Sequence, residues 1–119
     1  SMPNGLAFSP DEKSLYIADS DHKVHHIRRF PVLADNSLGE GEVFVEIEPG
    51  IADGIRVDSA GRLFSTAADG VQVFGPEGKL LGKFHTPQTA ANCAFGGPTG
   101  NTLFITATSV VWAVEMNML

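Results

Sequence analysis

Three residues with a side-chain oxygen stand at the start of similar segments of this chain. They are Asn4, Asp53 and Asn92, and each precedes a short apolar stretch. Carboxylate and amide oxygens are the donors that hard cations such as calcium prefer, and a bound cation polarises an ester carbonyl or acidifies water. A plainer interpretation also fits, because Asn-Gly and Asp-Gly are common turn dipeptides. The residue types and their spacing leave both interpretations open.

The segments that begin at these residues share one pattern. Each runs from the polar residue through an apolar strand and a Gly-, Pro- or Asp-containing turn to a second apolar strand, and the starts lie 49 and 39 residues apart. Repeats of about this length are typical of β-propeller blades. Alternation and turn residues predict further strands at 23–30, 42–48, 70–75, 79–84 and 109–115. A helix over 22–30 is the alternative for the first of these, although Phe30-Pro31 would end it quickly.

The strand count predicts an all-β fold, a partial β-propeller of about three blades with four, four and three antiparallel strands. That is half of a six-bladed propeller. We expect one domain over residues 1–119, with blades roughly at 3–48, 52–84 and 91–115. Sheet edges left open in such a partial ring invite pairing with another chain, so the pattern predicts a homo-oligomer, most simply a dimer.

Composition excludes several classes of function. The formal net charge is −6 and there is no basic stripe, which argues against a nucleic-acid partner. No apolar run has membrane-spanning length, so we expect no membrane partner. Neither a basic nor an apolar leader precedes Asn4, and Cys93 is the single cysteine, which together favour a cytoplasmic location.

Other polar residues have simpler interpretations. His22 and His26 could hold zinc if they lay on a helix, but in a strand they are surface or interface histidines. Cys93 is interpreted as a small buried residue. Asp19 and Asp58 close strands, and we expect their carboxylates to hydrogen-bond to turn backbones.

The chain resembles the senescence-marker-protein/gluconolactonase family, which includes regucalcin. The resemblance covers essentially the whole chain and corresponds to the C-terminal part of the family's six-bladed propeller. Single motifs are moderately specific, and their order is more specific. The segments that carry it are Pro3-Asn4-Gly5-Leu6-Ala7-Phe8, Ala52-Asp53-Gly54-Ile55-Arg56-Val57-Asp58 and Ala91-Asn92-Cys93-Ala94-Phe95-Gly96-Gly97-Pro98.

The resemblance implies hydrolysis of a small lactone or related ester at a divalent metal in the propeller channel, with calcium as the first expectation and zinc as the second. Asn4 and Asp53 match family metal ligands, and Asp53 also matches the proposed general base. Asn92 stands where the family has a pocket-lining residue, so we expect it to contact substrate. A glutamate ligand from the family's N-terminal part has no counterpart here. The resemblance therefore predicts a metal-dependent sugar lactonase whose site is incomplete in the isolated chain.

A second function remains open beside the enzyme. Propellers also serve as non-catalytic binding scaffolds, and the fold alone does not separate the two roles. The alternative is a propeller fragment that acts as a self-associating or protein-interaction module.

Overall fold

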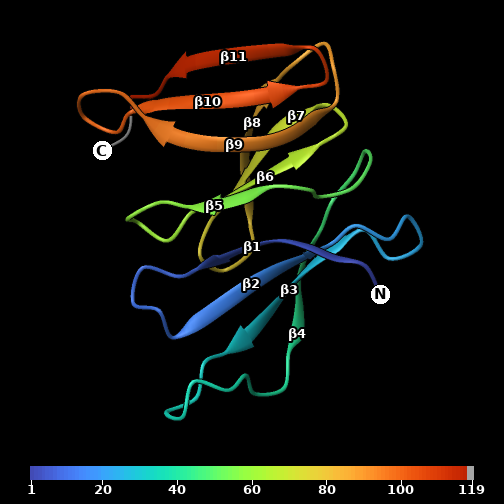
Figure 1. Ribbon diagram of the computed structural model, residues 1–119, viewed down its shortest axis with the longest axis vertical. Coiled ribbons are helices and arrows are strands. Elements are labelled where there is room, and N and C mark those ends of the chain that lie inside the picture. The colour runs from blue at the N-terminus through green and yellow to red at the C-terminus, as the bar shows by residue number, and fades with distance from the viewer. Residues whose placement is uncertain (118–119) are drawn as a thin grey trace.

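The computed structural model describes residues 1–117, and all of its regular elements in that range are β-strands (Figure 1). Three antiparallel sheets form it. The first holds β1 (Pro3–Phe8), β2 (Ser14–Asp19), β3 (His26–Pro31) and β4 (Glu42–Glu46). The second holds β5 (Ile55–Val57), β6 (Leu63–Ala67), β7 (Gly70–Phe74) and β8 (Leu80–His85), and the third holds β9 (Ala90–Gly96), β10 (Thr102–Ala107) and β11 (Val110–Glu115).

Consecutive strands pair within each sheet, so each sheet is an up-and-down meander in the manner of a propeller blade. The first strands of the three sheets, β1, β5 and β9, run side by side through the middle of the molecule (Figure 1). The predicted all-β partial propeller with four, four and three strands is thereby confirmed.

The middle sheet explains the long apolar runs of the second repeat. Every residue of β6 and β7 is buried, because this sheet has another sheet on each face. One core lies between the first and second sheets, around Ile27, Ile55 and Leu63. The other lies between the second and third sheets, around Phe64, Leu103 and Ile105. Each core contains an edge-to-face aromatic pair, Tyr16 with Phe44 and Phe64 with Phe95.

The doubtful segment at 22–30 forms a strand, as expected, but a shorter one. Asp21 starts a turn in which its carbonyl accepts the N–H groups of Val24 and His25, and its carboxylate accepts that of Lys23. His25 has a φ of 30° at the end of the turn, and β3 begins only at His26. The strand prediction started three residues early because an Asx-type turn competes locally with strand pairing.

The two outer sheets each leave one face open to solvent. On the first sheet, Leu6 and Val43 are 57% and 47% exposed, and pairing places them in one row across the strands. On the third sheet, Val111 is 67% exposed.

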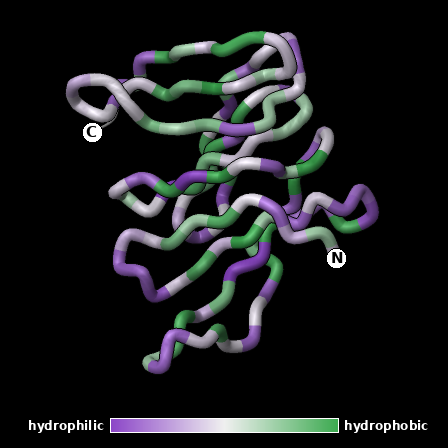
Figure 2. Tube along the Cα trace, viewed as in Figure 1, coloured by the Kyte–Doolittle hydropathy of each residue, from purple (hydrophilic) through white to green (hydrophobic). Residues whose placement is uncertain are grey.

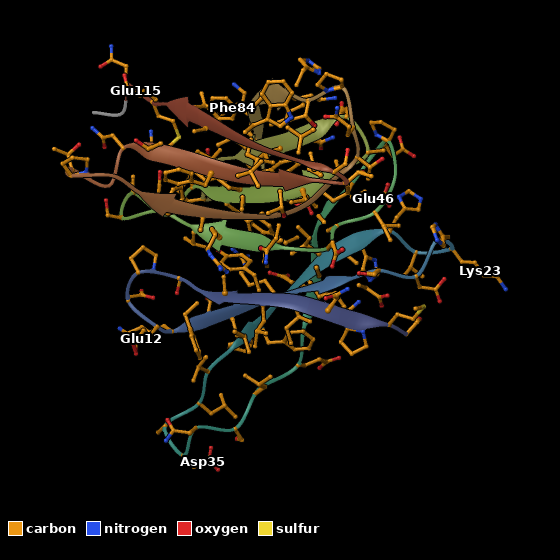
Figure 3. The ribbon with its side chains drawn as sticks, turned by 45° about the horizontal axis from the view of Figure 1, so that its top comes forward. Glu12, Lys23, Asp35, Glu46, Phe84 and Glu115 are labelled. Carbon is orange, nitrogen blue, oxygen red and sulfur yellow. The ribbon has the colours of Figure 1, made fainter. Side chains whose placement is uncertain are left out.

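Figure 2 shows apolar stretches along the strands and polar turns between them. Charged side chains such as Glu12, Lys23 and Asp35 project from turn tips (Figure 3). Among the described residues, no helix could span a membrane.

Candidate metal centre on the inner strands

Backbone hydrogen bonds bring the three predicted site residues to one end of the inner strands. Gly5 N–H donates to the carbonyl of Asp53 at 2.9 Å, which joins the first sheet to the second. Gly54 N–H donates to the carbonyl of Ala91 at 3.0 Å, which joins the second sheet to the third. Asn4, Asp53 and Asn92, each adjacent to one of these bonds, therefore come from three sheets to neighbouring backbone positions.

The two glycines are required by close approach of the sheets and not by a turn. Gly5 lies within β1, and neither Gly5 nor Gly54 has a positive φ. A Cβ on Gly5 would collide with the Asp53 carbonyl oxygen, and one on Gly54 would lie 2.8 Å from Asn92 Cα. The turn interpretation of Asn4-Gly5 and Asp53-Gly54 is therefore wrong, and these dipeptides mark the junctions between blades.

The peptide that carries Asp53 is held from three sides. The buried hydroxyl of Thr66 accepts the N–H groups of Asp53 at 3.0 Å and Gly54 at 3.1 Å. Ser20 Oγ donates to the carbonyl of Ala52 at 2.7 Å. Sequence reasoning missed Thr66 and Ser20, since their hydroxyls bond to backbone groups 12 to 32 residues away, which no local motif reveals. Such fixed backbone positions are what a functional side chain needs from its scaffold.

The carboxylate of Asp53 differs from the other aspartates. Each of those accepts at least one hydrogen bond from the chain, and they are Asp11, Asp19, Asp21, Asp35, Asp58 and Asp69. Within the described residues, Asp53 is half-buried and its carboxylate has neither a hydrogen-bond donor nor an ion-pair partner. A charged group on a rigid peptide with no internal partner is available for an external cation.

The two asparagines differ in how free their side chains are. Asn4 is exposed and lies at an irregularity in the pairing of β1 with β2. Asn92 Oδ1 accepts the N–H of Cys93 at 2.9 Å, so one lone pair of this oxygen is already used. The donor chemistry of Asn4 and Asp53 fits a hard cation, with one carboxylate and an amide oxygen. No cluster of three or more His, Cys, Asp or Glu side chains with metal-site geometry exists among residues 1–117, so water or further ligands would complete the coordination.

Asp19 lies at the same end of the strands, but its carboxylate already has hydrogen-bond donors within the chain. Its carboxylate accepts hydrogen bonds from the Ser1 amino group at 2.7 Å and from the N–H groups of Met2 and Asp21, both at 3.0 Å. The hydrogen bond from the amino terminus, followed by those from the backbone, lowers the pKa of Asp19 to about 2. The expectation that Asp19 bonds to nearby backbone is confirmed, and so is that for Asp58, which accepts the N–H groups of Ala60 and Arg62.

The histidines do not form the zinc pair that a helix would have allowed. His25 Nδ1 lies 2.8 Å from the carbonyl oxygen of Ile47, and His26 Nε2 lies 4.0 Å from the Asp19 carboxylate. With β3 starting at His26, residues 22 and 26 do not share a helical face.

Comparison with known proteins agrees with this arrangement of sheets. Residues 1–109 match the model of the SMP-30/Gluconolactonase/LRE-like region. The chain belongs to this family. It is 38% identical to a gluconolactonase of Zymomonas mobilis over 97% of the chain and 35% of that protein. Among solved structures, a gluconolactonase of Xanthomonas campestris superposes with a TM-score of 0.90 at 39% identity, covering 97% of this chain and 38% of that one.

A more distant structural match is a regucalcin of Agrobacterium tumefaciens, described as a calcium-binding protein. It superposes with a TM-score of 0.78 at 28% identity, over 88% of this chain and 37% of that one. The chain thus spans a little over a third of the length of each of these three proteins.

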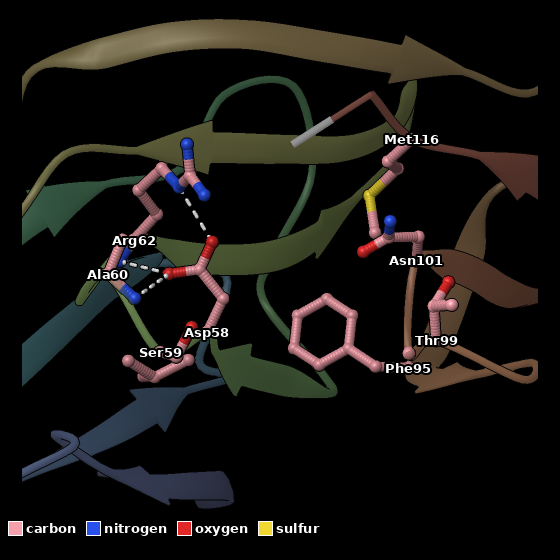
Figure 4. Close-up of a pocket in the computed structure, with 10 residues that line it drawn as sticks. Asp58, Ser59, Ala60, Arg62, Phe95, Thr99, Asn101 and Met116 are labelled. Atoms are coloured by element: carbon pink, nitrogen blue, oxygen red, sulfur yellow. Dashed lines mark hydrogen bonds and ion pairs between the residues drawn. The ribbon is translucent and has the colours of Figure 1, made fainter. Parts of the chain in front are cut away.

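In this chain, a depression lies at the opposite end of β5 (Figure 4). None of Asn4, Asp53 and Asn92 lines it. It measures about 380 Å³ and lies between the turn after β5 and the end of β9, with Phe95 and Met116 in its wall. Arg62 and Asp58 in it pair with each other at 2.6 Å. Because those charges neutralise each other, the unpartnered carboxylate of Asp53 remains the better candidate for chemistry.

Proposed function

We propose that this chain carries part of the metal centre of a sugar lactonase, with Asn4 and Asp53 holding a divalent cation. Calcium is the first choice, because both donors are oxygens, and zinc is the second. One observation supports the proposal above the rest: Asp53 is the one aspartate among the described residues whose carboxylate has no partner in the chain, although its backbone is held by Thr66 and Gly5.

Each of the three residues has a separate role in the proposed reaction. Asp53 accepts the proton of the attacking water, and Asn4 helps to orient the cation beside it. Asn92 contacts the substrate with its amide group, the oxygen of which already bonds to Cys93 N–H. A bound cation would polarise the lactone carbonyl and stabilise the developing oxyanion. Sugar lactones are proposed as substrates because relatives in the family, such as the Zymomonas protein, are gluconolactonases.

Calcium binding by the full chain tests this proposal. We expect calcium to raise the thermal midpoint and to bind measurably in isothermal titration calorimetry, since a ligand of the folded state stabilises it. Asp53→Asn should weaken calcium affinity by roughly tenfold or more, because affinity follows the charge of the ligands. Without calcium, the same variant should melt close to the wild type, since the carboxylate has no internal partner to lose.

Asp58→Asn is the matched control, because it removes the same charge five residues further along the chain, just beyond the end of β5. It should lower the midpoint through loss of the Arg62 pair and leave calcium affinity unchanged. Equal calcium binding by wild type and Asp53→Asn would reject the metal role of Asp53. An assay of gluconolactone hydrolysis, which measures the acid released, then tests whether the chain is active by itself.

A self-associating module is the second candidate function. It is favoured by the apolar side chains on both open sheet faces, where Leu6, Phe8 and Val111 are more than half exposed. Large exposed apolar patches mark interaction sites in soluble proteins.

A further inference from the structure

Arg56 is the one cationic residue on the three inner strands, β1, β5 and β9. It is half-buried, yet no carboxylate in residues 1–117 forms an ion pair with it. Its hydrogen bond within the described part of the chain goes to the carbonyl of its own neighbour Ile55 at 3.1 Å. Arg29 and Arg62, by contrast, each pair with a carboxylate at 2.6 Å. A guanidinium has five N–H donors, so most of those on Arg56 are available.

The surroundings of Arg56 place it beside the residue expected to contact substrate. It lines a depression of about 140 Å³ together with Asn92 and Cys93 of β9, and Phe104 of β10 forms an apolar wall. Burial raises the pKa of Cys93 to about 11, and the positive charge of Arg56 partly offsets that rise, which agrees with a guanidinium close to β9. Asp53 stands three residues earlier and forms no ion pair with Arg56.

We propose that Arg56, with Asn92 beside it, forms an anion-binding subsite that takes the carboxylate of a sugar acid. This inference rests on the proposed lactonase function, since opening a lactone adds water across the ester C–O bond and leaves a carboxylate, a hydroxyl and a released proton. A planar guanidinium matches a carboxylate in a bidentate pair. The neutral lactone lacks that charge, so Arg56 would hold product in preference to substrate.

Gluconate titration of the isotope-labelled full chain, followed by amide NMR, tests the subsite. In metal-free buffer, gluconate should shift the amide signals of Arg56, Asn92 and Cys93, and it should bind about tenfold more tightly than the neutral analogue gluconamide. Arg56→Gln should remove that preference. Arg56→Lys should retain part of it, because the charge remains but the planar fork is lost.

Lys79→Gln is the matched control, since it removes one positive charge from the exposed connection between β7 and β8, which are not inner strands. It should keep the preference for gluconate. An unchanged preference in a folded Arg56→Gln would overturn the subsite, and so would a preference lost equally in the Lys79 variant. If Arg56→Gln does not fold, the wild-type preference and its partial loss in Arg56→Lys decide the question.

Adding calcium separates this inference from the metal proposal. If gluconate binds only with calcium and Arg56→Gln binds it as well as wild type, the anion subsite is wrong and the metal centre stands. If gluconate binding without calcium requires Arg56 while calcium itself does not bind, the subsite stands and the metal centre is wrong.

Discussion

At the scale of single residues, the position of Asp53 depends on the hydroxyl of Thr66. Thr66→Val keeps the shape and removes the acceptor, which leaves the Asp53 N–H unsatisfied because Gly54 N–H still has the Ala91 carbonyl. We expect a loss of about 1–3 kcal/mol in the free energy of unfolding. Calcium affinity should also fall, and Thr66→Ser should restore both. Chemical denaturation and calorimetry measure the two effects, and full calcium affinity in the valine variant would show that the hydroxyl does not position Asp53.

Cys93 gives a pH-dependent prediction at the same scale. The thiol is 3% exposed, and burial raises its pKa to about 11 from an ordinary value of 9.0. The unfolded chain therefore ionises first as pH rises, so this group's contribution to stability is complete below about pH 9 and is lost as pH rises from 9 towards 11. Cys93→Ser or Cys93→Ala should reduce that alkaline fall in the thermal midpoint.

Alkylation provides an independent measurement on Cys93. At pH 8.5 iodoacetamide should react slowly with the native chain and rapidly with the denatured chain, because the thiolate is the nucleophile. Equal rates in the two states would contradict burial of the thiol.

At the scale of elements, the junctions between sheets depend on glycines that approach a neighbouring backbone. Gly5→Ala would drive a methyl group into the Asp53 carbonyl, and backbone atoms cannot move aside cheaply. We expect destabilisation of about 1–3 kcal/mol, measured by urea denaturation. Gly82→Ala on β8 is the control, because nothing lies within 4 Å of the added methyl group. It should be neutral or slightly stabilising, and a similar cost at both positions would contradict a specific junction at Gly5.

At the scale of the whole molecule, the open faces of the first and third sheets predict self-association. Two copies related by a two-fold axis could pack the first sheet of each against the third sheet of the other, which closes the ring. We expect a dimer by light scattering at micromolar concentration. Val111→Lys or Leu6→Lys should shift it towards monomer.

Leu33→Lys serves as the control for these charge substitutions, because Leu33 is 46% exposed but lies outside the named strands. It should leave the dimer intact. A wild-type monomer across this concentration range would count against the interaction module and leave the lactonase proposal unaffected.

Much of the architecture could be predicted because its signals are local. Alternating strands and turn residues repeat in the same order three times, and this predicts the sheets whatever the rest of the chain does. The error at His25 arose where a side-chain-capped turn competes with the strand. The candidate site was harder to predict from the sequence, since the types and spacing of Asn4, Asp53 and Asn92 suit either turn residues or metal ligands. Those features alone could not decide between them.

The amino-acid sequence by itself determined the all-β propeller pattern, the net charge of −6 and the set of oxygen-bearing residues at the blade starts. Only the tertiary structure decided that Gly5 and Gly54 are blade junctions and that Thr66 and Ser20 hold the peptide of Asp53. It also decided that, among residues 1–117, the Asp53 carboxylate has no hydrogen-bond or ion-pair partner and Arg56 has no ion-pair partner. The reason is physical. Whether a charged group is satisfied depends on atoms tens of residues away, which only folding brings within hydrogen-bond distance.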